Sequence, residues 1–454
     1  MARSLRKLAR SGKAALAAAE QQAAQGPPIH VLAADGPLEP AQGRTLIGDL
    51  AASLPDPARF ERQLLREQAV TRQPLVAGND VALLVDGPAT YAAMLAAIAS
   101  AEEHVHLETY ILADDDVGRK LSDALIAKCR AGIDVRLVYD AVGAIESSDA
   151  YFERLQEGGV ACIKFHPVDP TEDARIWRIN ERDHRKILVI DGRVGFTGGI
   201  NFSSTYASSS RSRPGAKDGL LTGWRDTHVR VEGPVVSQLQ RLFLDVWHDH
   251  CDDAQSQAGE SSFYPRPAAA GDTLVRMIAS NGSDGLRSAI FAAYLNAFAH
   301  AQRYIWLTQA YFAPDDHLLD ALRGAAARGV DVRVVVPGFT DSTLIFNASR
   351  ARYGRLLRAG VRVYEMPGAL LHAKTAVIDG VWSTVGSSNL DSRSARHNLE
   401  ANAVILGRSF GRRMESLFEE DRANAVEITR KAWRRRGSVE RMKERFATLF
   451  DYWL

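Results

Sequence analysis

The sequence predicts an α/β protein made of two related lobes, each an α/β/α sandwich around a mixed, largely parallel sheet. Three observations lead to this prediction. The chain has 454 residues, which exceeds one ordinary hydrophobic core and favours two domains of about 200 residues each. Short runs rich in Val, Ile and Leu alternate with helical stretches, as they do in βαβ units. The same order of elements then occurs a second time along the chain.

An internal repeat relates the two halves. Its members are an apolar strand, a strand that follows a Gly-x-Asp turn, and a strand that follows Gly-Val. The matched segments are 104–115 with 303–316, 130–140 with 327–337, and 157–167 with 358–368. Between the first two strands of each half the sequence predicts a helix that ends at Gly132 or at Gly329, because glycine commonly follows the last turn of a helix.

The repeat and the composition divide the chain into five parts. Residues 1–75 have no counterpart in the repeat and are expected to form an extension. Residues 251–272 are rich in Ser, Ala, Gly and Pro, which is typical of a linker. We therefore expect a first lobe at 76–250, a second lobe at 273–420, and a basic, amphipathic tail at 421–454.

Composition argues against some classes of protein. The net charge is only +1 with 24% charged residues, so no overall field attracts nucleic acid. No run of 18 apolar residues occurs, and a membrane-spanning helix is not expected. Three cysteines without a C-x-x-C pair, Cys129, Cys162 and Cys251, favour a reducing compartment over a disulfide framework. The basic start of the chain, before Glu20, is either a solvated leader or a contact with anionic lipid.

A polar motif also occurs once in each half. Residues 184–191 read HRKILVID and residues 372–379 read HAKTAVID, which gives His-x-Lys-x-x-x-x-Asp twice. Aligned without gaps over eighteen residues, the two stretches share eight identities, including a Gly and an Asn that follow the His at equal distances. A match of this quality between chemically reactive residues indicates two related half-sites.

The motif residues suit a phosphodiester. His and Lys are two positions apart, so on a strand both side chains leave the same face. Lysines and asparagines would neutralise and bind the non-bridging oxygens, one imidazole would attack phosphorus, and the other would protonate the departing oxygen. No metal or other cofactor is expected, because the lysines carry the countercharge. The predicted catalytic residues are His184, Lys186, Asn201, His372, Lys374 and Asn389, and the predicted phosphate ligands among them are Lys186, Asn201, Lys374 and Asn389.

Two further features accompany each motif. Small residues at 198–199 and 386–388 are expected to let backbone amides approach a ligand closely. Each His also needs a carboxylate that orients its second ring nitrogen. Asp226 lies 42 residues after His184, Glu400 lies 28 residues after His372, and the first half carries an extra loop of similar length. We therefore expect each carboxylate to open the next strand and to pair with the His of its own half.

The aspartates that end the motifs, Asp191 and Asp379, lie a full strand length beyond the histidines. Asp-Gly is a turn sequence, so a structural role is favoured for both.

Three other polar segments have competing interpretations. WHDHCDD at 247–253 could bind a metal, but its contiguous spacing favours a polar helix end with Trp247 packed inward. RKAWRRR at 430–436 precedes Phe446, Leu449, Phe450 and Trp453 at helical spacing, which favours contact with a lipid surface over intramolecular packing. The loop at 207–219, with Arg211, Arg213 and Lys217, is either a gate near the first His or a disordered insertion.

The doubled motif resembles that of the phospholipase D superfamily, over nearly all of residues 78–420. GNDVALLVDGPATYAAMLAAIASA, WRDTHVRVEGPVV and GSSNLDSRSARHNLEANAV look more narrowly like bacterial cardiolipin synthases. The resemblance implies a phospholipase D fold whose pseudo-twofold lobes share one active site at their junction. Asp226 and Glu400 fall where that family has its His-orienting carboxylates. The chain looks like a shorter branch of the family, without two N-terminal membrane helices.

The resemblance implies phosphatidyl transfer through a phosphohistidine, with His184 as nucleophile and His372 as acid and base. The expected product is cardiolipin, formed from phosphatidylglycerol and a second glycerophospholipid. Alternatives are a phospholipase D that yields phosphatidic acid, a nucleic-acid phosphodiesterase, which the charge argues against, and a non-catalytic membrane scaffold, which the intact motifs argue against. The expected setting is peripheral, on anionic lipid at the cytoplasmic side of the bacterial inner membrane. No oligomeric state is predicted.

Overall fold

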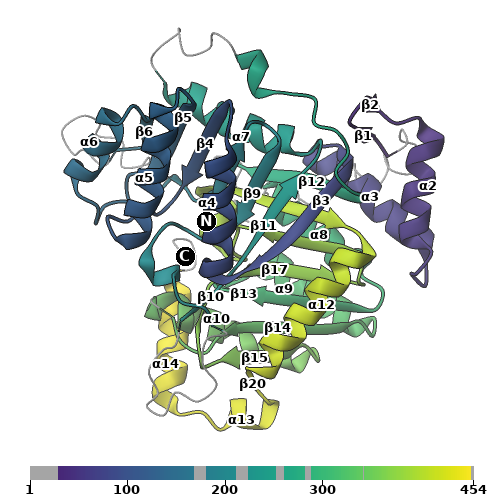
Figure 1. Cartoon of the computed structure of the whole chain (residues 1–454). Helices are drawn as coiled ribbons and strands as arrows, with labels where there is room; N and C mark the ends of the chain where they lie inside the picture. The colour runs from purple at the N-terminus through teal and green to yellow at the C-terminus, as the bar shows by residue number, and fades with distance from the viewer. Residues whose placement is uncertain are drawn as a thin grey trace.

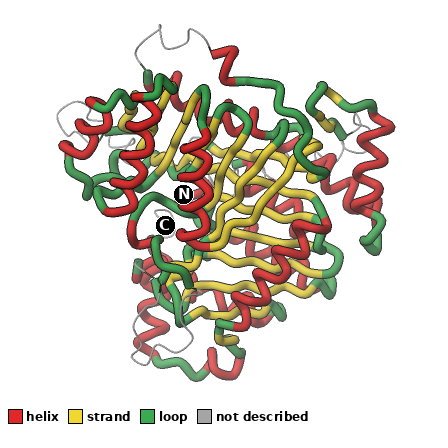
Figure 2. The backbone as a smooth tube through the Cα atoms, viewed as in Figure 1, coloured by secondary structure: helices red, strands yellow, loops and turns green. Residues whose placement is uncertain are grey.

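Most strands of both lobes join in one curved sheet with helices on its two faces, and one strand from each lobe contributes to a separate two-stranded sheet (Figures 1 and 2). The computed structural model describes residues 29–167, 180–210, 223–251, 260–281, 288–340 and 342–450. The predicted fold class is confirmed: each lobe is an α/β/α sandwich around a mixed sheet. The loop residues Arg211, Arg213 and Lys217, the basic residues before position 29, and Trp453 lie outside the described residues.

The first lobe contains the earlier half of the repeat. Its strands are β3 (Leu75–Val85), β4 (His104–Thr109), β5 (Asp134–Asp140), β6 (Ala161–Phe165), β7 (Arg182–Asp183), β8 (Ile187–Ile190), β9 (Val194–Gly198), β10 (Trp224–Arg225) and β11 (Thr227–Glu232). Its helices are α4 (Asp86–Ser100), α5 (Asp116–Arg130), α6 (Asp149–Glu157) and α7 (Val236–His250), with a 3₁₀ turn at Ser204–Tyr206. A further 3₁₀ turn follows at Glu260–Phe263.

The second lobe repeats this order. Its strands are β12 (Thr273–Ser280), β13 (Tyr304–Gln309), β14 (Asp331–Pro337), β15 (Arg362–Met366), β16 (Leu370–Leu371), β17 (Lys374–Ile378), β18 (Trp382–Gly386), β19 (Asn398–Leu406) and β20 (Val426–Glu427). Its helices are α8 (Ala289–His300), α9 (Asp316–Ala327), α10 (Thr343–Arg358), α11 (Ser392–Arg396) and α12 (Arg408–Ala423).

The strand order makes the pseudo-twofold relation explicit. Neighbours run β6-β5-β4-β8-β9-β11-β3 in the first lobe and β15-β14-β13-β17-β18-β19-β12 in the second. Strands β3 and β12 pair antiparallel and join the two halves. Helical crossovers make β4-β5-β6 and β13-β14-β15 parallel, whereas the tight turns between β8 and β9 and between β17 and β18 make these pairs antiparallel.

Local sequence explains the matching helices. Asp115 and Asp315 cap α5 and α9 by accepting backbone N–H groups of the first turn. Gly132 and Gly329 follow the two helices with φ of 84° and 88°, a conformation that favours glycine. Both helix ends are where the sequence predicts them. Trp247 is buried on α7, as expected for a polar helix end packed by one aromatic ring.

The described part of the extension adds β1 to strand β3 of the first lobe and packs its helices on the second lobe. It contains β1 (Val31–Ala33), β2 (Gly36–Pro37), α2 (Pro40–Ala51) and α3 (Pro57–Thr71), and α3 lies beside α8 (Figure 1). Buried Glu67 on α3 accepts hydrogen bonds from Arg276 at 2.8 Å and from the Trp382 indole at 3.0 Å. The extension therefore completes the core of the lobe that is more distant in sequence.

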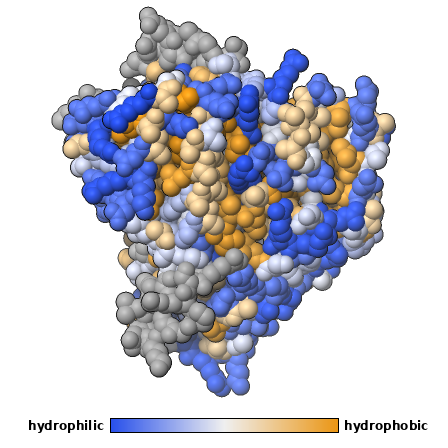
Figure 3. All heavy atoms as spheres, in the orientation of Figure 1, coloured by the Kyte–Doolittle hydropathy of each residue, from blue (hydrophilic) through white to orange (hydrophobic). Residues whose placement is uncertain are grey.

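The tail forms α13 (Arg430–Arg434), α14 (Ser438–Ala447) and a 3₁₀ turn at Thr448–Phe450. Helix α14 packs along α10, while Phe446, Leu449 and Phe450 remain exposed. No helix among the described residues has the length and apolar character needed to cross a bilayer. On the face in Figure 3, hydrophobic residues gather over α4 and the neighbouring strands, and hydrophilic residues surround them.

Candidate active site

Both motif histidines lie at the junction of the lobes. Each follows a two-residue strand that pairs with a segment of the opposite lobe: β7 pairs parallel with the start of β19, and β16 pairs parallel with β10. The pairing continues into the histidines themselves. The His184 backbone N–H donates to the Leu399 carbonyl at 3.0 Å, and the His372 N–H donates to the Arg225 carbonyl at 2.8 Å.

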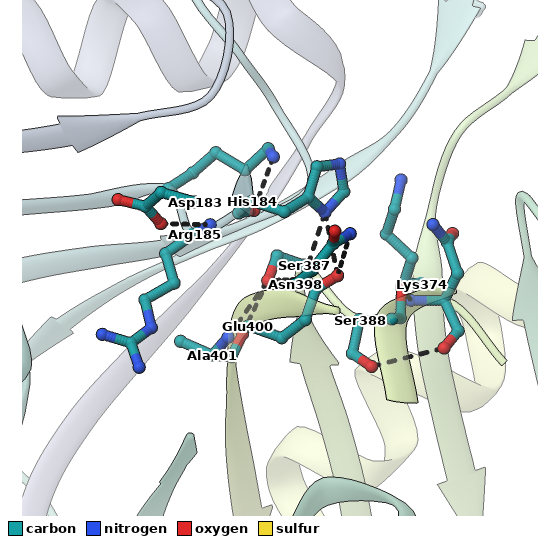
Figure 4. Close-up of polar contacts among 12 residues, drawn as sticks. Asp183, His184, Arg185, Lys374, Ser387, Ser388, Asn398, Glu400 and Ala401 are labelled. Carbon is teal, nitrogen blue, oxygen red and sulfur yellow. Dashed lines mark hydrogen bonds and ion pairs between the residues drawn. The ribbon is translucent and has the colours of Figure 1, made fainter. Parts of the chain in front are cut away.

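The carboxylates pair across the lobes, so the prediction that each serves the His of its own half is wrong. His184 Nδ1 lies 3.1 Å from both carboxylate oxygens of Glu400, as Figure 4 shows. His372 Nδ1 lies 2.8 Å from Asp226 Oδ2. The reason is the strand exchange: Glu400 directly follows the residue that binds the His184 backbone, and Asp226 directly follows the residue that binds the His372 backbone.

One cavity of about 360 Å³ contains both histidines in its wall. Because each Nδ1 faces a carboxylate, Nε2 is the ring nitrogen left for a ligand. The predicted residues that line the cavity are His184, Asn201, His372 and Asn389. Of the other predicted residues, the structure places Lys186, Lys374, Asp226 and Glu400 behind this wall, almost completely buried.

The two lysines support the histidine backbones. Lys186 Nζ donates to the His184 carbonyl at 2.7 Å and lies over the Tyr110 ring, 5.2 Å from its centre. Lys374 Nζ donates to the His372 carbonyl and lies 2.9 Å from His372 Nδ1. An ammonium group has three donors, so each lysine can hold the main chain and still place positive charge beneath the cavity.

The two asparagines differ in their contacts. Asn201 accepts the Ile111 backbone N–H at 3.1 Å and donates to the Tyr206 hydroxyl at 2.9 Å. Asn389 Oδ1 is buried and has no hydrogen-bond partner among the described residues. Its amide group therefore keeps hydrogen-bonding capacity at the cavity.

The small-residue loops do not offer their amides to a ligand, which corrects the expectation for 198–199 and 386–388. The Gly199 and Ser387 N–H groups donate to the strand-β11 and strand-β19 backbones, and the Ser388 N–H donates to a side chain. Gly199 is needed for another reason: a Cβ there would lie 2.2 Å from Asp226 Oδ1. At the equivalent position, the Ser387 hydroxyl donates to Glu400.

Aromatic rings and charges that the sequence analysis missed complete the cavity. Tyr110 lies edge-on to His184, with ring centres 5.0 Å apart, and Trp224 lies 5.4 Å from His372. The other lining residues that were missed are Ile111, Arg182, Tyr206, Tyr311, Ile345, Asp391, Arg393, Ser394 and Asn398. Position could have indicated two of them, because Arg182 precedes the first motif by two residues and Trp224 precedes Asp226 by two.

Burial and nearby cations lower the pKa of both imidazoles. Burial, with Lys186 and Lys374, lowers the pKa of His184 well below its usual value. Burial and Lys374 also lower the pKa of His372, but the Asp226 carboxylate acts in the opposite direction. The imidazolium form is therefore more accessible at His372 than at His184.

The two carboxyls are shifted in opposite directions. Burial disfavours the Asp226 anion, but Lys374 and His372 outweigh it and hold the pKa of Asp226 below its usual value. Burial raises the pKa of Glu400 to about 7, although Lys186 opposes this. Burial also lowers the pKa of Lys186 to about 7. At neutral pH, Asp226 is charged, and Glu400 and Lys186 are near their titration points.

The terminal motif aspartates lie far from this chemistry. Asp191 has φ of 52° and accepts three backbone N–H groups, from residues 102, 103 and 104. Asp379 has φ of 54° and accepts the N–H groups of residues 302, 303 and 304. Both side chains tie the turn after the motif strand to the strand beside it, which supports a structural role.

Comparisons with known proteins agree with this geometry. A family model described as cardiolipin synthase, PLD-like domain, matches residues 94–211 and 294–422. Cardiolipin synthase of Alkalihalophilus pseudofirmus is 37% identical over 386 residues, covering 84% of this chain and 73% of that protein. Cardiolipin synthase of Geobacillus kaustophilus is 35% identical over 395 residues, covering 87% and 76%.

A solved structure shares the fold. Phosphatidylserine synthase of Haemophilus influenzae superposes with a TM-score of 0.62 and 14% sequence identity, covering 86% of this chain and 99% of that one. The likeness extends across both lobes.

Proposed function

This chain belongs to the cardiolipin synthase family of phospholipase D-like enzymes, and we propose that it makes cardiolipin by phosphatidyl transfer. The observation that carries the proposal is the pair of histidines in one cavity, each with a carboxylate at Nδ1 and with Nε2 left for a ligand. Two poised imidazoles suit the two steps of a transfer reaction, because one can bond to phosphorus while the other moves protons.

In the first step, His184 Nε2 attacks the phosphorus of a donor phospholipid. The bond from phosphorus to the headgroup oxygen breaks, and the leaving oxygen takes a proton from His372. In the second step, His372 takes the proton of a phosphatidylglycerol hydroxyl, whose oxygen attacks the phosphohistidine and releases His184. One phosphodiester forms for each that breaks, so no other energy source is needed.

The electrostatics support this division of roles. A nucleophile must be neutral, and the pKa of His184 is held well below its usual value. A general acid must carry a proton. Burial and Lys374 lower the pKa of His372, but the charged Asp226 opposes that shift and stabilises the imidazolium. Glu400, the carboxyl beside His184, is less charged at neutral pH, because burial raises its pKa to about 7. Pairs of groups whose surroundings separate their pKa values commonly take different catalytic roles.

Two lysines and two asparagines account for binding of the phosphoryl group. Lys186 and Lys374 lie directly behind the histidines, and Asn201 and Asn389 lie in the cavity wall. We assign all four to the non-bridging oxygens, where negative charge is concentrated in the transition state.

We also place the enzyme peripherally on anionic lipid, with phospholipid rather than nucleic acid as its partner. The exposed apolar side chains of the tail support this, since they follow the basic run at 430–436. The three unpaired cysteines suit the cytoplasmic side of a bacterial inner membrane, where thiols stay reduced.

Mass spectrometry of lipid products tests the proposal. Purified protein would receive vesicles of phosphatidylglycerol, with and without phosphatidylethanolamine, beside a His372→Ala control. Cardiolipin with released glycerol or ethanolamine would support the synthase and identify the donor. Phosphatidic acid alone would show that water is the acceptor, and the enzyme would then be a phospholipase D.

A further inference from the structure

A second cavity, outside the active site, has five arginines among its eight lining residues. It has a volume of about 360 Å³ and lies on the second lobe between α10, α13 and α14. We call it the arginine pocket. Its lining residues are Ala351, Gly354, Arg355, Arg358, Trp433, Arg434, Arg436 and Arg441. No carboxylate is among these lining residues, which sets the pocket apart from an ordinary salt-bridged surface.

Three of the five arginines have no acidic partner among the described residues. Arg355 pairs with Asp316, and Arg436 is held by both carboxylate oxygens of Glu444. The other three are exposed at the rim, and none forms an ion pair within the described ranges; they are Arg358, Arg434 and Arg441. Arg441 donates to the Arg434 and Arg436 carbonyls, at 2.8 and 3.2 Å, and keeps its full charge. Three guanidinium groups whose charge no carboxylate neutralises therefore surround one hollow and suit a phosphate group.

Ring stacking and hydrogen bonds hold the wall of the pocket. Trp433 is buried, and its ring lies 5.1 Å from the Tyr353 ring. The Arg436 guanidinium stacks 3.8 Å from the centre of the indole while Glu444 fixes its nitrogens. A cation held by stacking and by hydrogen bonds loses little freedom when a ligand binds.

Positive charge is concentrated in this part of the chain. Residues 430–445 contain eight basic and two acidic residues, although the whole chain has a net charge of only +1. The rest of the chain is therefore net acidic as a whole, although residues 1–13 add five basic residues and no acidic one. An anionic surface would be attracted to these basic segments rather than to the molecule as a whole.

An apolar stripe extends from the pocket along the same helix. Its members are exposed on α14 and the turn that follows: Val439, Met442, Phe446 and Leu449. Helix α14 runs antiparallel to α10: Arg441 lines the arginine pocket with Arg358, and Ala447 packs against Ala348 at the other end. The stripe thus begins at the arginine pocket and ends near the start of α10.

Helix α10 links the two cavities. Ile345 lines the catalytic cavity, and Gly354 lines the arginine pocket. With a rise of 1.5 Å per residue, the two contacts are roughly 15 Å apart along the helix. A bilayer that contacted the arginine pocket and the stripe would therefore lie beside the catalytic cavity.

We propose that the arginine pocket binds the phosphate of an anionic phospholipid headgroup in the bilayer surface, apart from the catalytic cavity. Together with the apolar stripe, it holds the second lobe on the membrane with the catalytic cavity beside it. The proposal rests on phospholipids being the substrates, and it adds a second lipid site that takes no part in the chemistry.

Two charge-matched variants test the proposal. The pocket variant carries Arg358→Gln, Arg434→Gln and Arg441→Gln. The control removes the same charge from exposed arginines elsewhere and carries Arg44→Gln, Arg130→Gln and Arg412→Gln. Binding would be measured by flotation with vesicles of equal parts phosphatidylcholine and phosphatidylglycerol. Turnover would be measured separately on a short-chain phosphatidylglycerol that stays monomeric.

The pocket variant should bind the vesicles about 100-fold more weakly than the unaltered protein, whereas the control should stay within about threefold. Both variants should turn over the monomeric lipid at the normal rate. Equal losses for the two variants would show general charge attraction and overturn the proposal. A second result would also overturn the proposal. If the pocket variant lost the binding of inorganic phosphate but still bound vesicles normally, the site would serve a free anion.

The same measurements separate this proposal from the proposed function. The unaltered protein could fail to convert the monomeric lipid while the pocket variant still loses vesicle binding as predicted. The proposed lipid site would then be supported, and the proposed activity would be wrong. If the triple variant unfolds, a double variant with Arg358→Gln and Arg434→Gln takes its place in the same measurements. Neither of these side chains donates a hydrogen bond among the described residues, so the double variant should fold. The expected loss is then about 30-fold.

Discussion

The two half-sites have one backbone plan but different surroundings. Beneath His184 lies a buried charge network, in which Asp140 accepts the Asp183 backbone N–H and lies 3.6 Å from Arg182. Arg185 lies 3.9 Å from Glu108 in the same layer. The equivalent positions beneath His372 hold uncharged residues instead. By strand register and motif alignment they are Thr308, Pro337, Leu370, Leu371 and Ala373.

The orienting carboxylates differ in the same way. Gly199 leaves room for Asp226, which keeps its charge beside Lys374. Ser387 takes the position of that glycine and donates to Glu400, whose pKa burial raises to about 7. The repeat thus gives the half-sites matched geometry, and the residues around the two carboxylates shift their pKa values in opposite directions. A repeated backbone can therefore hold two histidines that have unequal roles.

The largest effect should come from removing either imidazole. We expect His184→Ala and His372→Ala each to reduce kcat by about 10⁴-fold or more, because the two groups act as a unit. Steady-state formation of cardiolipin would measure this. Near-normal turnover in either variant would mean that the half-sites work independently, and the single shared site would be wrong.

Removing charge from the carboxylates should separate the half-sites. At neutral pH, Asp226→Asn removes a full charge and should lower kcat by about 10³- to 10⁴-fold, as for the orienting aspartate of a catalytic triad. Glu400→Gln replaces a carboxyl whose pKa burial raises to about 7, so it removes less charge and should cost about 10- to 100-fold. Equal losses in the two variants, with both proteins folded, would contradict the assigned asymmetry.

The pH profile should be bell-shaped near pH 7. Glu400 becomes charged as the pH rises through about 7, and Lys186 loses its charge over the same range. Because the two groups interact, the profile reports the pair rather than either residue. Glu400→Gln should remove the acidic limb and Lys186→Arg the alkaline limb, since arginine stays protonated. Unchanged limbs in kcat against pH would rule out this pair as their source.

The smallest effect on activity should come from the turn aspartates. Asp191→Asn and Asp379→Asn each weaken charge-assisted bonds to three backbone N–H groups. We expect each to lower the free energy of unfolding by about 1–3 kcal/mol, measured in urea, with kcat of the folded protein within about twofold. A stable but inactive Asp191→Asn protein would overturn the structural role. Unequal losses of unfolding free energy in the two variants would show that the two turns are not equivalent.

The sequence predicted the lobes and the motif residues because both follow from local periodicity and from a gapless repeat. Cross-lobe pairing could not be read in this way. Asp226 and Glu400 have the same sequence signature whichever His they serve, and only the β7–β19 and β10–β16 pairing decides it. The contact of Glu67 with Arg276 was likewise hidden, because the extension has no counterpart in the repeat.

Identifying the histidine that carries the covalent intermediate would show which half-site supplies the nucleophile. His372→Ala would be mixed with a short-chain phosphatidylglycerol, sampled over the time of that variant's own slow turnover and digested for mass spectrometry, with His184→Ala as the control. We predict a phosphatidyl adduct on Nε2 of His184 in the first variant and none in the second. An adduct on His372 in the His184→Ala protein would reverse the roles of the two half-sites and contradict the account.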